Sequence, residues 1–307
     1  MLSTSFEGLN RIDLNGPTMG TRWQAQFWLA EGAETAPIER AMQAAVDRVD
    51  AQMSLWRRES DLCRLNAAPV GAWVDLGDEI TRVLTRALEI GQQSGGAFEI
   101  AMGPAVAAWG FGPEPADPAR VRALLQDRRP MRARELLELD VANHRARKHG
   151  PARFDLNGIA KGFGTDRLIE VAQEMGLTAR TGLTAGIDGD LRCLGTRPDG
   201  SLWPIAIEEP DYERRAAHSL MELGDTAIAT SGDYRHWVDV GSTRLSHTMN
   251  PDLKAPVTGA PASVTVLAPD CMSADGWATA LMVLGRETGS ALARANGIQA
   301  MFLERAP

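Results

Sequence analysis

The sequence of 307 residues predicts one compact unit in which helices and strands are mixed. Hydrophobic residues make up 44% and charged residues 23%, which are ordinary values for a globular protein with a sizeable core. Residues 22–29 alternate between apolar and polar side chains as a strand does, whereas 37–53 place apolar side chains at helical spacing. No repeat, low-complexity tract or obvious linker interrupts the sequence. We therefore expect a single domain over residues 1–307, built of two intimately packed lobes.

Charge and cysteine content exclude several classes of protein. The net charge of -8 argues against a nucleic-acid partner, because binding a phosphate backbone depends on clustered cations. Cys63, Cys193 and Cys271 lie far apart without a CxxC pair, which argues against a cysteine zinc site and a disulfide framework. No stretch reaches the roughly 18 apolar residues of a membrane helix. Residues 1–7 show no export signal, so we expect a cytoplasmic protein, or a periplasmic one if a leader was removed.

Two long helices are expected in the first third of the chain. One runs over 37–53 and begins at a proline, and the other is capped by Asp78 and stops at the glycines of 94–96. The polar loop 55–73 between them could contact a ligand, although a turn with local hydrogen bonds is the simpler explanation.

The later elements follow from the same patterns. Glycines beside aromatic residues in 96–112 are expected where the backbone passes close to a flat ligand or to a helix. A short helix begins at Asp117, and 136–156 predicts two or three short strands. Residues 185–190 predict a tight glycine-rich turn. Further strands are expected at 203–207, 226–230, 238–240, 245–248, 263–267 and 299–303, and further helices at 273–285 and 287–296.

The central stretch carries the first candidate site. Residues 154–156 predict a short buried strand, followed by an Asn-Gly turn and a helix from Ile159. A helix opening from such a turn presents unpaired N–H groups and the positive end of its dipole, so it favours an anion. Lys161 in the first turn is unfavourable there unless a negative group, such as a diphosphate, binds beside it, and Asp155 is a second candidate for ligand contact. The alternative is a plain strand–turn–helix corner with an exposed lysine.

A metal site is expected further along the chain. Asp275 and Thr279 lie four residues apart on a predicted helix, so both oxygen-bearing side chains share one face. Carboxylate, hydroxyl, carbonyl and phosphate oxygens are ligands that Mg²⁺ accepts. The alternative is that Asp275 complements the helix start and Thr279 bonds to a backbone carbonyl.

Histidine completes the candidate set. His144, His149, His218, His236 and His247 show no metal-ligand spacing, so zinc is not expected. A neutral His247 near a diphosphate could take a proton from an attacking hydroxyl, since its ordinary pKa is about 6.5, although a lone histidine is more often structural.

Taken together, these segments resemble the ApbE family, the FAD:protein FMN transferases, across nearly the whole chain. The matching landmarks, in the family's order, are 19–21, 60–66, 95–99, 103–104 with 109–112, 155–166, 230–234, His247 with Pro251, and 274–280. The resemblance implies an α+β fold with largely antiparallel sheets, outer helices and FAD in a cleft between two lobes. It also implies Mg²⁺-dependent transfer of FMN from FAD to a threonine hydroxyl of an acceptor protein, with release of AMP.

By the same resemblance, each site residue receives a role. The residues expected to line the FAD site are Met19, Trp56, Ala97, Phe98, Glu99, Asp155, Lys161 and Met249. The backbone carbonyl of Gly158, with Asp275 and Thr279, is expected to hold Mg²⁺. His247 is expected to activate the acceptor threonine.

The sequence also departs from the family pattern. Glu99 stands where aspartate is usual, Ala101 where threonine is common, and 187–190 lacks one glycine of a usual pair. The family's Asp-Pro-x-Thr-Gly after the histidine is Asn-Pro-Asp-Leu-Lys here, in 250–254. This change bears on acceptor recognition or catalytic rate more than on FAD binding. Two alternatives therefore stay open, an FAD pyrophosphatase giving FMN and AMP, and a non-catalytic flavin-binding or carrier protein. A kinase is not favoured, because no GxxxxGK[ST] loop is present.

Overall fold

The computed structural model describes residues 8–127, 129, 132–234, 237–240 and 243–305. Residues 1–7, from which we predicted the compartment, and His236 lie outside these ranges. Among the described residues, no helix combines the length and the apolar character needed to cross a bilayer.

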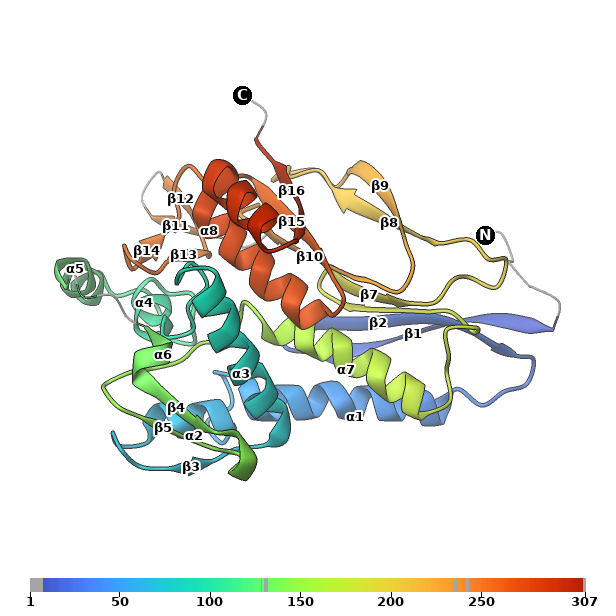
Figure 1. The fold of residues 1–307 in the computed structure, drawn as a ribbon, viewed down its shortest axis with the longest axis horizontal. Helices are drawn as coiled ribbons and strands as arrows, with labels where there is room; N and C mark the ends of the chain where they lie inside the picture. The colour runs from blue at the N-terminus through green and yellow to red at the C-terminus, as the bar shows by residue number, and fades with distance from the viewer. Residues whose placement is uncertain (1–7, 128, 130–131, 235–236, 241–242, 306–307) are drawn as a thin grey trace.

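The largest sheet of the described residues has seven strands (Figure 1). Its order is β1-β2-β6-β7-β10-β15-β16, and each neighbouring pair is antiparallel. The strands are β1 (Leu9–Thr18), β2 (Thr21–Ala30), β6 (Leu183–Ile187), β7 (Asp190–Leu194), β10 (Ala227–Gly232), β15 (Ser263–Ala268) and β16 (Gln299–Leu303). The predicted α+β class with largely antiparallel sheets is confirmed.

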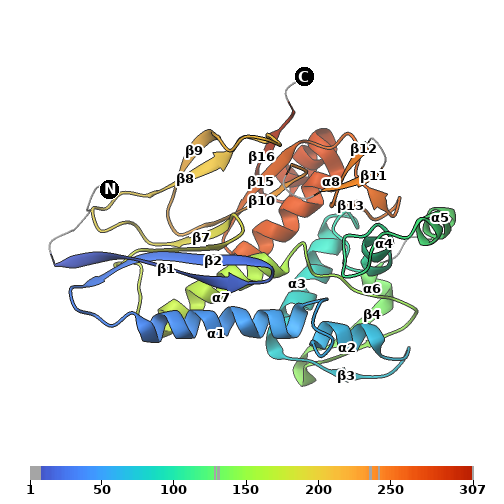
Figure 2. The same cartoon turned by 180° about the vertical axis from the view of Figure 1, so that it is seen from behind.

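Helices cover one face of this sheet and a hairpin covers the other, as Figures 1 and 2 show from opposite sides. The helices are α1 (Ala36–Met53), α7 (Ala160–Glu174) and α8 (Cys271–Ala295). The hairpin consists of β8 (Trp203–Glu208) and β9 (Ala217–Leu223), and it packs Trp203 against Trp28 with ring centroids 5.3 Å apart. The helices therefore bury the apolar side chains of one face, and the hairpin buries those of part of the other.

Residues 61–148 form a second group of elements. It contains α2 (Asp61–Ala67), β3 (Val74–Asp75), α3 (Asp78–Gln93), α4 (Gly103–Ala108), α5 (Pro118–Gln126), α6 (Ala133–Leu136), β4 (Leu137–Asp140), the 3₁₀ helix η1 (Val141–Asn143) and β5 (Arg145–Lys148). Three of its strands form a small sheet in the order β3-β5-β4. The arm, defined as residues 103–127 with α4 and α5, projects from this group of elements (Figure 1). Two further hairpins, β11 (Trp237–Val240) with β12 (Thr243–Ser246) and β13 (Met249–Asn250) with β14 (Ala255–Pro256), complete the fold.

One apolar cluster joins this second group of elements to the large sheet and its helices. It contains Leu84 of α3, Phe163 of α7, Leu281 of α8 and Val266 of β15, all of them fully buried. We keep the single domain as a proposal, and this shared core supports it.

Several predicted elements are confirmed and two are wrong. The region 55–73, predicted as a polar loop, contains the helix α2, because the Ser60 side chain caps its start by accepting from the Cys63 N–H. The two C-terminal helices meet at Gly285, whose φ of 74° and ψ of 176° interrupt α8 where the sequence predicted a break. The predicted turn at 185–190 is the two-residue connection between β6 and β7, with positive φ at Asp188 and Gly189. The predicted strand at 154–156 is absent from every described sheet. Instead, isolated hydrogen bonds to Asn66 and Ile100 hold this extended segment, because no neighbouring strand runs beside it.

Candidate functional site

A cavity of about 1250 Å³ opens between the sheet, the starts of α7 and α8, and the arm. Every site residue predicted from the sequence lines it: Met19, Trp56, Ala97, Phe98, Glu99, Asp155, Gly158, Lys161, His247, Met249, Asp275 and Thr279. The fold thus brings together, in one hollow, residues that are up to 260 positions apart in the chain.

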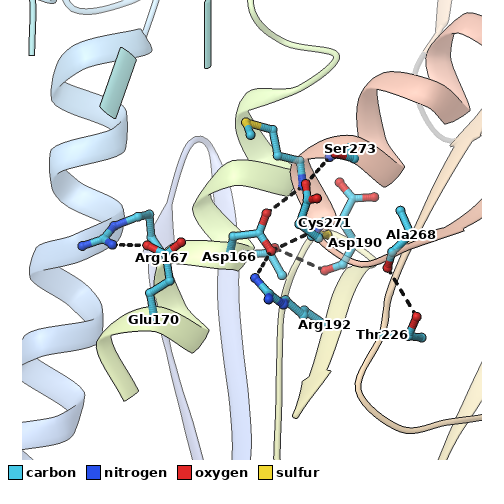
Figure 3. Close-up of polar contacts among 12 residues, drawn as sticks. Asp166, Arg167, Glu170, Asp190, Arg192, Thr226, Ala268, Cys271 and Ser273 are labelled. Atoms are coloured by element: carbon cyan, nitrogen blue, oxygen red, sulfur yellow. Dashed lines mark hydrogen bonds and ion pairs between the residues drawn. The ribbon is translucent and has the colours of Figure 1, made fainter. Parts of the chain in front are cut away.

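The floor of the cavity is built by the adjoining first turns of α7 and α8. The Asp275 carboxylate accepts a hydrogen bond of 3.0 Å from the Gly162 N–H at the start of α7. In return, the Asp166 carboxylate accepts from the N–H groups of Cys271 and Met272 at 2.9 and 2.8 Å (Figure 3). Each helix therefore supplies a negative charge to the positive end of the other, which stabilises both starts.

Glycine at position 162 permits this close approach. A Cβ atom there would lie 2.3 Å from the Cys271 carbonyl oxygen and 2.7 Å from the Asp275 Cβ. Both are parts of α8 that a side-chain rotation cannot move away. Glycine at position 162 is thus required by the packing of the two helices.

Lys161 lies among carboxylates of the protein itself. Its Nζ is 3.0 Å from Asp188 Oδ2. Burial acts to lower the pKa of Lys161, but the charges of Asp190, Asp188 and Asp275 outweigh it and raise that pKa above its ordinary value. We predicted that this cation needs a negative group beside it. The chain supplies that group, so Lys161 is a half-buried charge-paired residue and not the exposed lysine of the alternative.

The acids of the floor outnumber their cation. Burial raises the pKa of Asp275 to about 6. The pKa of Asp190 is raised well above its ordinary value by burial and by the nearby charge of Asp275. With Asp188 also present, three carboxylates face the single ammonium of Lys161. A further cation bound here would stabilise the ionised forms of these buried carboxyl groups.

Oxygen donors suited to such a cation lie beside Asp275. The Thr279 hydroxyl is 3.2 Å from the Ser231 hydroxyl, and an added Cβ at Gly158 would lie 3.1 Å from Thr279 Oγ1. Within the described part of the chain, no three His, Cys, Asp or Glu side chains group closely enough to hold a metal. A metal ion at this place therefore depends on carbonyl and hydroxyl oxygens in addition to Asp275, a donor set that fits Mg²⁺.

A wall of the cavity beside the floor is formed by 97–99 and by Asp155. Glu99 Oε1 accepts from the N–H groups of Ala101 and Ala133, both at 2.9 Å. Burial raises the pKa of Glu99 despite these bonds. One carboxylate oxygen thus holds the wall to the backbone beyond it, a structural role that the sequence did not indicate. Burial also raises the pKa of Asp155 to about 6.

The rim carries an aromatic side chain and a histidine, and two other residues of the cavity have left-handed backbone. Trp56 is 60% exposed at the rim, and His247 is exposed just beyond the end of β12, near a strand end as predicted. Met19 and Asp188, which also line the cavity, have φ of 42° and 53°. Such backbone is unfavourable for residues other than glycine and tends to occur at functional sites.

Sequence reasoning missed several cavity residues. The floor is lined by Asp188, Asp190 and Ser231. Another side of the cavity is lined by residues 205–208 of β8, in the β8–β9 hairpin. The two aspartates on either side of Gly189 are a visible signal of a charged site. The prediction for this turn rests on its glycines alone and does not use these aspartates. Nothing in the sequence of β8 indicates that it reaches the cavity.

Fold and site together define an α+β protein with a large ligand cavity, a charged floor at two helix starts and an aromatic residue at the rim. The chain belongs to the ApbE family, whose family model matches residues 19–302.

Relatives and solved structures agree with this assignment. A protein of Vibrio cholerae named FAD:protein FMN transferase is 34% identical over 296 residues, covering 95% of this chain and 87% of the relative. The structure of the flavin transferase ApbE from Vibrio cholerae superposes with a TM-score of 0.84 at 32% identity, covering 97% of this chain and 94% of the other. The apo form of the flavinyl transferase ApbE of Pseudomonas stutzeri gives a TM-score of 0.84 at 32% identity, covering 97% and 92%.

Proposed function

We propose that this protein is a magnesium-dependent transferase that moves FMN from FAD to a threonine hydroxyl of an acceptor protein and releases AMP. The observation that carries the proposal is the floor of the cavity, where Lys161, the start of α7 and the Asp275–Thr279 pair adjoin. The names of the relatives support the same chemistry. A volume of about 1250 Å³ exceeds the roughly 300–1,000 Å³ of sites for drug-sized ligands, which suits a dinucleotide.

The proposed reaction is a phosphoryl-group substitution. The threonine oxygen forms a bond to the phosphorus of the FMN half of FAD. The bond between this phosphorus and the bridging oxygen breaks, and AMP leaves with that oxygen. The hydroxyl proton passes to His247, which is exposed at the rim where an acceptor can reach it.

The floor residues bind the diphosphate and its metal. The carbonyl of Gly158, the Asp275 carboxylate and the Thr279 hydroxyl would hold Mg²⁺, which when bound neutralises charge on the phosphate oxygens. The Lys161 ammonium, already held in place by Asp188, faces the same charge. The remaining predicted residues form the surface around the rest of FAD. They are Met19, Trp56, Ala97, Phe98, Glu99, Asp155 and Met249.

Labelling of an acceptor tests the proposal. The protein is incubated with FAD, Mg²⁺ and a purified protein that carries a threonine flavinylation motif, and the acceptor is examined by in-gel flavin fluorescence and mass spectrometry. We expect an added FMN on threonine and an equal amount of AMP, both abolished by EDTA. AMP and FMN formed without an acceptor would favour the pyrophosphatase. Tight FAD binding without any product would favour the carrier protein.

A further inference from the structure

The hairpin that follows His247 determines where one side of the cavity lies. β13 and β14 pair Met249 with Pro256, and the Val257 N–H donates to the Thr248 carbonyl at 2.9 Å. His247, Met249 and Pro251 of this segment all line the cavity. The direction in which the hairpin points therefore sets the position of these side chains over the floor.

Lys254, at the tip of the hairpin, combines two unfavourable features. Its φ of 53° is left-handed, a conformation that is unfavourable for a residue with a Cβ and that glycine adopts freely. Its side chain is only 1% exposed, although it carries an ammonium group whose removal from water is costly. Glycine at this position would avoid both costs, so the surroundings of Lys254 must compensate them.

The compensation comes from the arm. Lys254 Nζ donates to the Asp127 carbonyl oxygen at 2.6 Å, at the end of α5, and lies 3.5 Å from the Asp127 carboxylate. The Trp109 indole N–H donates to the Lys254 carbonyl at 3.0 Å, at the end of α4. The lysine thus joins the hairpin to both helices of the arm.

A second contact joins the same hairpin to the wall of the cavity. One nitrogen of Arg132 donates to the Asp252 carboxylate at 2.6 Å, and another donates to the Gly96 carbonyl at 3.4 Å. Gly96 directly precedes the wall 97–99. The hairpin is therefore held from two directions, by a buried ammonium and by a guanidinium that is 15% exposed.

We propose that Lys254 is a positioning residue that fixes the β13–β14 hairpin against the arm, and thereby fixes His247 and Met249 over the cavity. This inference rests on the proposed transferase function. It also gives a physical meaning to one part of the departure at 250–254, because Lys254, which stands where the family has glycine, makes the contact that holds the hairpin to the arm. We therefore expect the departure to preserve transfer to the acceptor.

Three variants test the role of the ammonium. Lys254→Gly removes the side chain and the backbone strain together, and Lys254→Met keeps the aliphatic stem but removes the charge. Lys148→Met is the matched control, since Lys148 is 5% exposed and donates to the carbonyls of Asn66 and Ala152 at 2.6 and 3.2 Å, away from the cavity. For each protein, we would measure kcat for FMN transfer, Kd for FAD, urea unfolding, and amide hydrogen exchange of 248–257.

Both Lys254 variants are expected to lose about 10- to 100-fold in kcat, as small misplacements of reacting groups do. Kd for FAD should rise by a smaller factor, because Met249 is one of many residues that line the cavity. The amide of Val257 should exchange faster in both. Lys148→Met should lower the urea midpoint without changing kcat or this exchange. A Lys254→Gly protein that is at least as stable as the wild type but slow in transfer would separate positioning from stability.

Two results would overturn the inference. One is normal kcat in both Lys254 variants while the wild type labels its acceptor. The other is an amide hydrogen exchange rate at Val257 that is the same in the Lys254 variants as in the wild type. This result would reject the positioning role of Lys254 even if the wild type makes no product. Absence of product from the wild type, with faster exchange in the Lys254 variants, would instead reject the transferase proposal and retain the structural role of the lysine.

Discussion

Replacing Gly162 by alanine tests how α7 and α8 meet below the cavity. The added Cβ would lie 2.3 Å from the Cys271 carbonyl oxygen and 2.7 Å from the Asp275 Cβ. To restore ordinary contacts, the two helix starts must move apart by roughly 1 Å in a closely packed region. That movement also lengthens the 3.0 Å hydrogen bond from the Gly162 N–H to Asp275.

The magnitude follows from three contributions. Overpacking of a core costs about 1–3 kcal/mol. Weakening a hydrogen bond to a charged group costs up to about 1.5–3 kcal/mol. Alanine is favoured over glycine within a helix by about 1 kcal/mol, which offsets part of the loss. We therefore expect Gly162→Ala to lower the free energy of unfolding by about 2–4 kcal/mol.

Urea unfolding of the protein without ligands is the assay, with Gly164→Ala as the control. The Cβ added at position 164 meets only the ends of two flexible side chains, Met19 Cε at 2.7 Å and Ile187 Cδ1 at 2.9 Å. These side-chain ends can move, so the free energy of unfolding of Gly164→Ala should remain within about 1 kcal/mol of the wild-type value. Equal midpoints for Gly162→Ala and the wild type would refute the described packing of the two helix starts.

The remaining predictions concern pH and proton transfer. Burial raises the pKa of Asp155 from 3.8 to about 6, so its contribution to stability is full below about pH 4 and is lost as the pH rises through 6. Asp155→Asn stays neutral at every pH. Its free energy of unfolding relative to that of the wild type, measured with urea, should therefore rise by up to about 3 kcal/mol between pH 4 and pH 8. A difference independent of pH would contradict this. His247→Ala should reduce transfer by about 10²–10⁴-fold while FAD binding is retained. The exposed His218 of β9, outside the cavity, supplies the control variant, and equal loss in both would remove His247 from the reaction.

The sequence predicted elements that depend on local patterns. The apolar spacing of α1 and α3 indicated which faces are buried, and the break at Gly285 followed from a glycine at the end of a helical pattern. The site residues were predicted through the family resemblance, because spacing alone left Asp275 and His247 with structural alternatives.

Features that depend on distant parts of the chain were not predictable in this way. The three carboxylates around Lys161 come from the β6–β7 turn, from β7 and from α8, and only the topology brings them together. The extended segment 154–156 has the composition of a strand but finds no strand partner among the described residues. Likewise, nothing in 250–254 indicates that Lys254 is buried, because its partner Asp127 is more than a hundred residues away.

Calorimetric titration of FAD into the protein, with Mg²⁺ or with EDTA, tests the central claim most directly. If the Asp275 carboxylate, the Thr279 hydroxyl and Lys161 together bind a diphosphate and its metal, FAD should bind more tightly with Mg²⁺. Asp275→Asn, which keeps an oxygen for the Gly162 N–H, should abolish this enhancement. Equal affinity with and without Mg²⁺, in the wild type and the variant alike, would contradict the account.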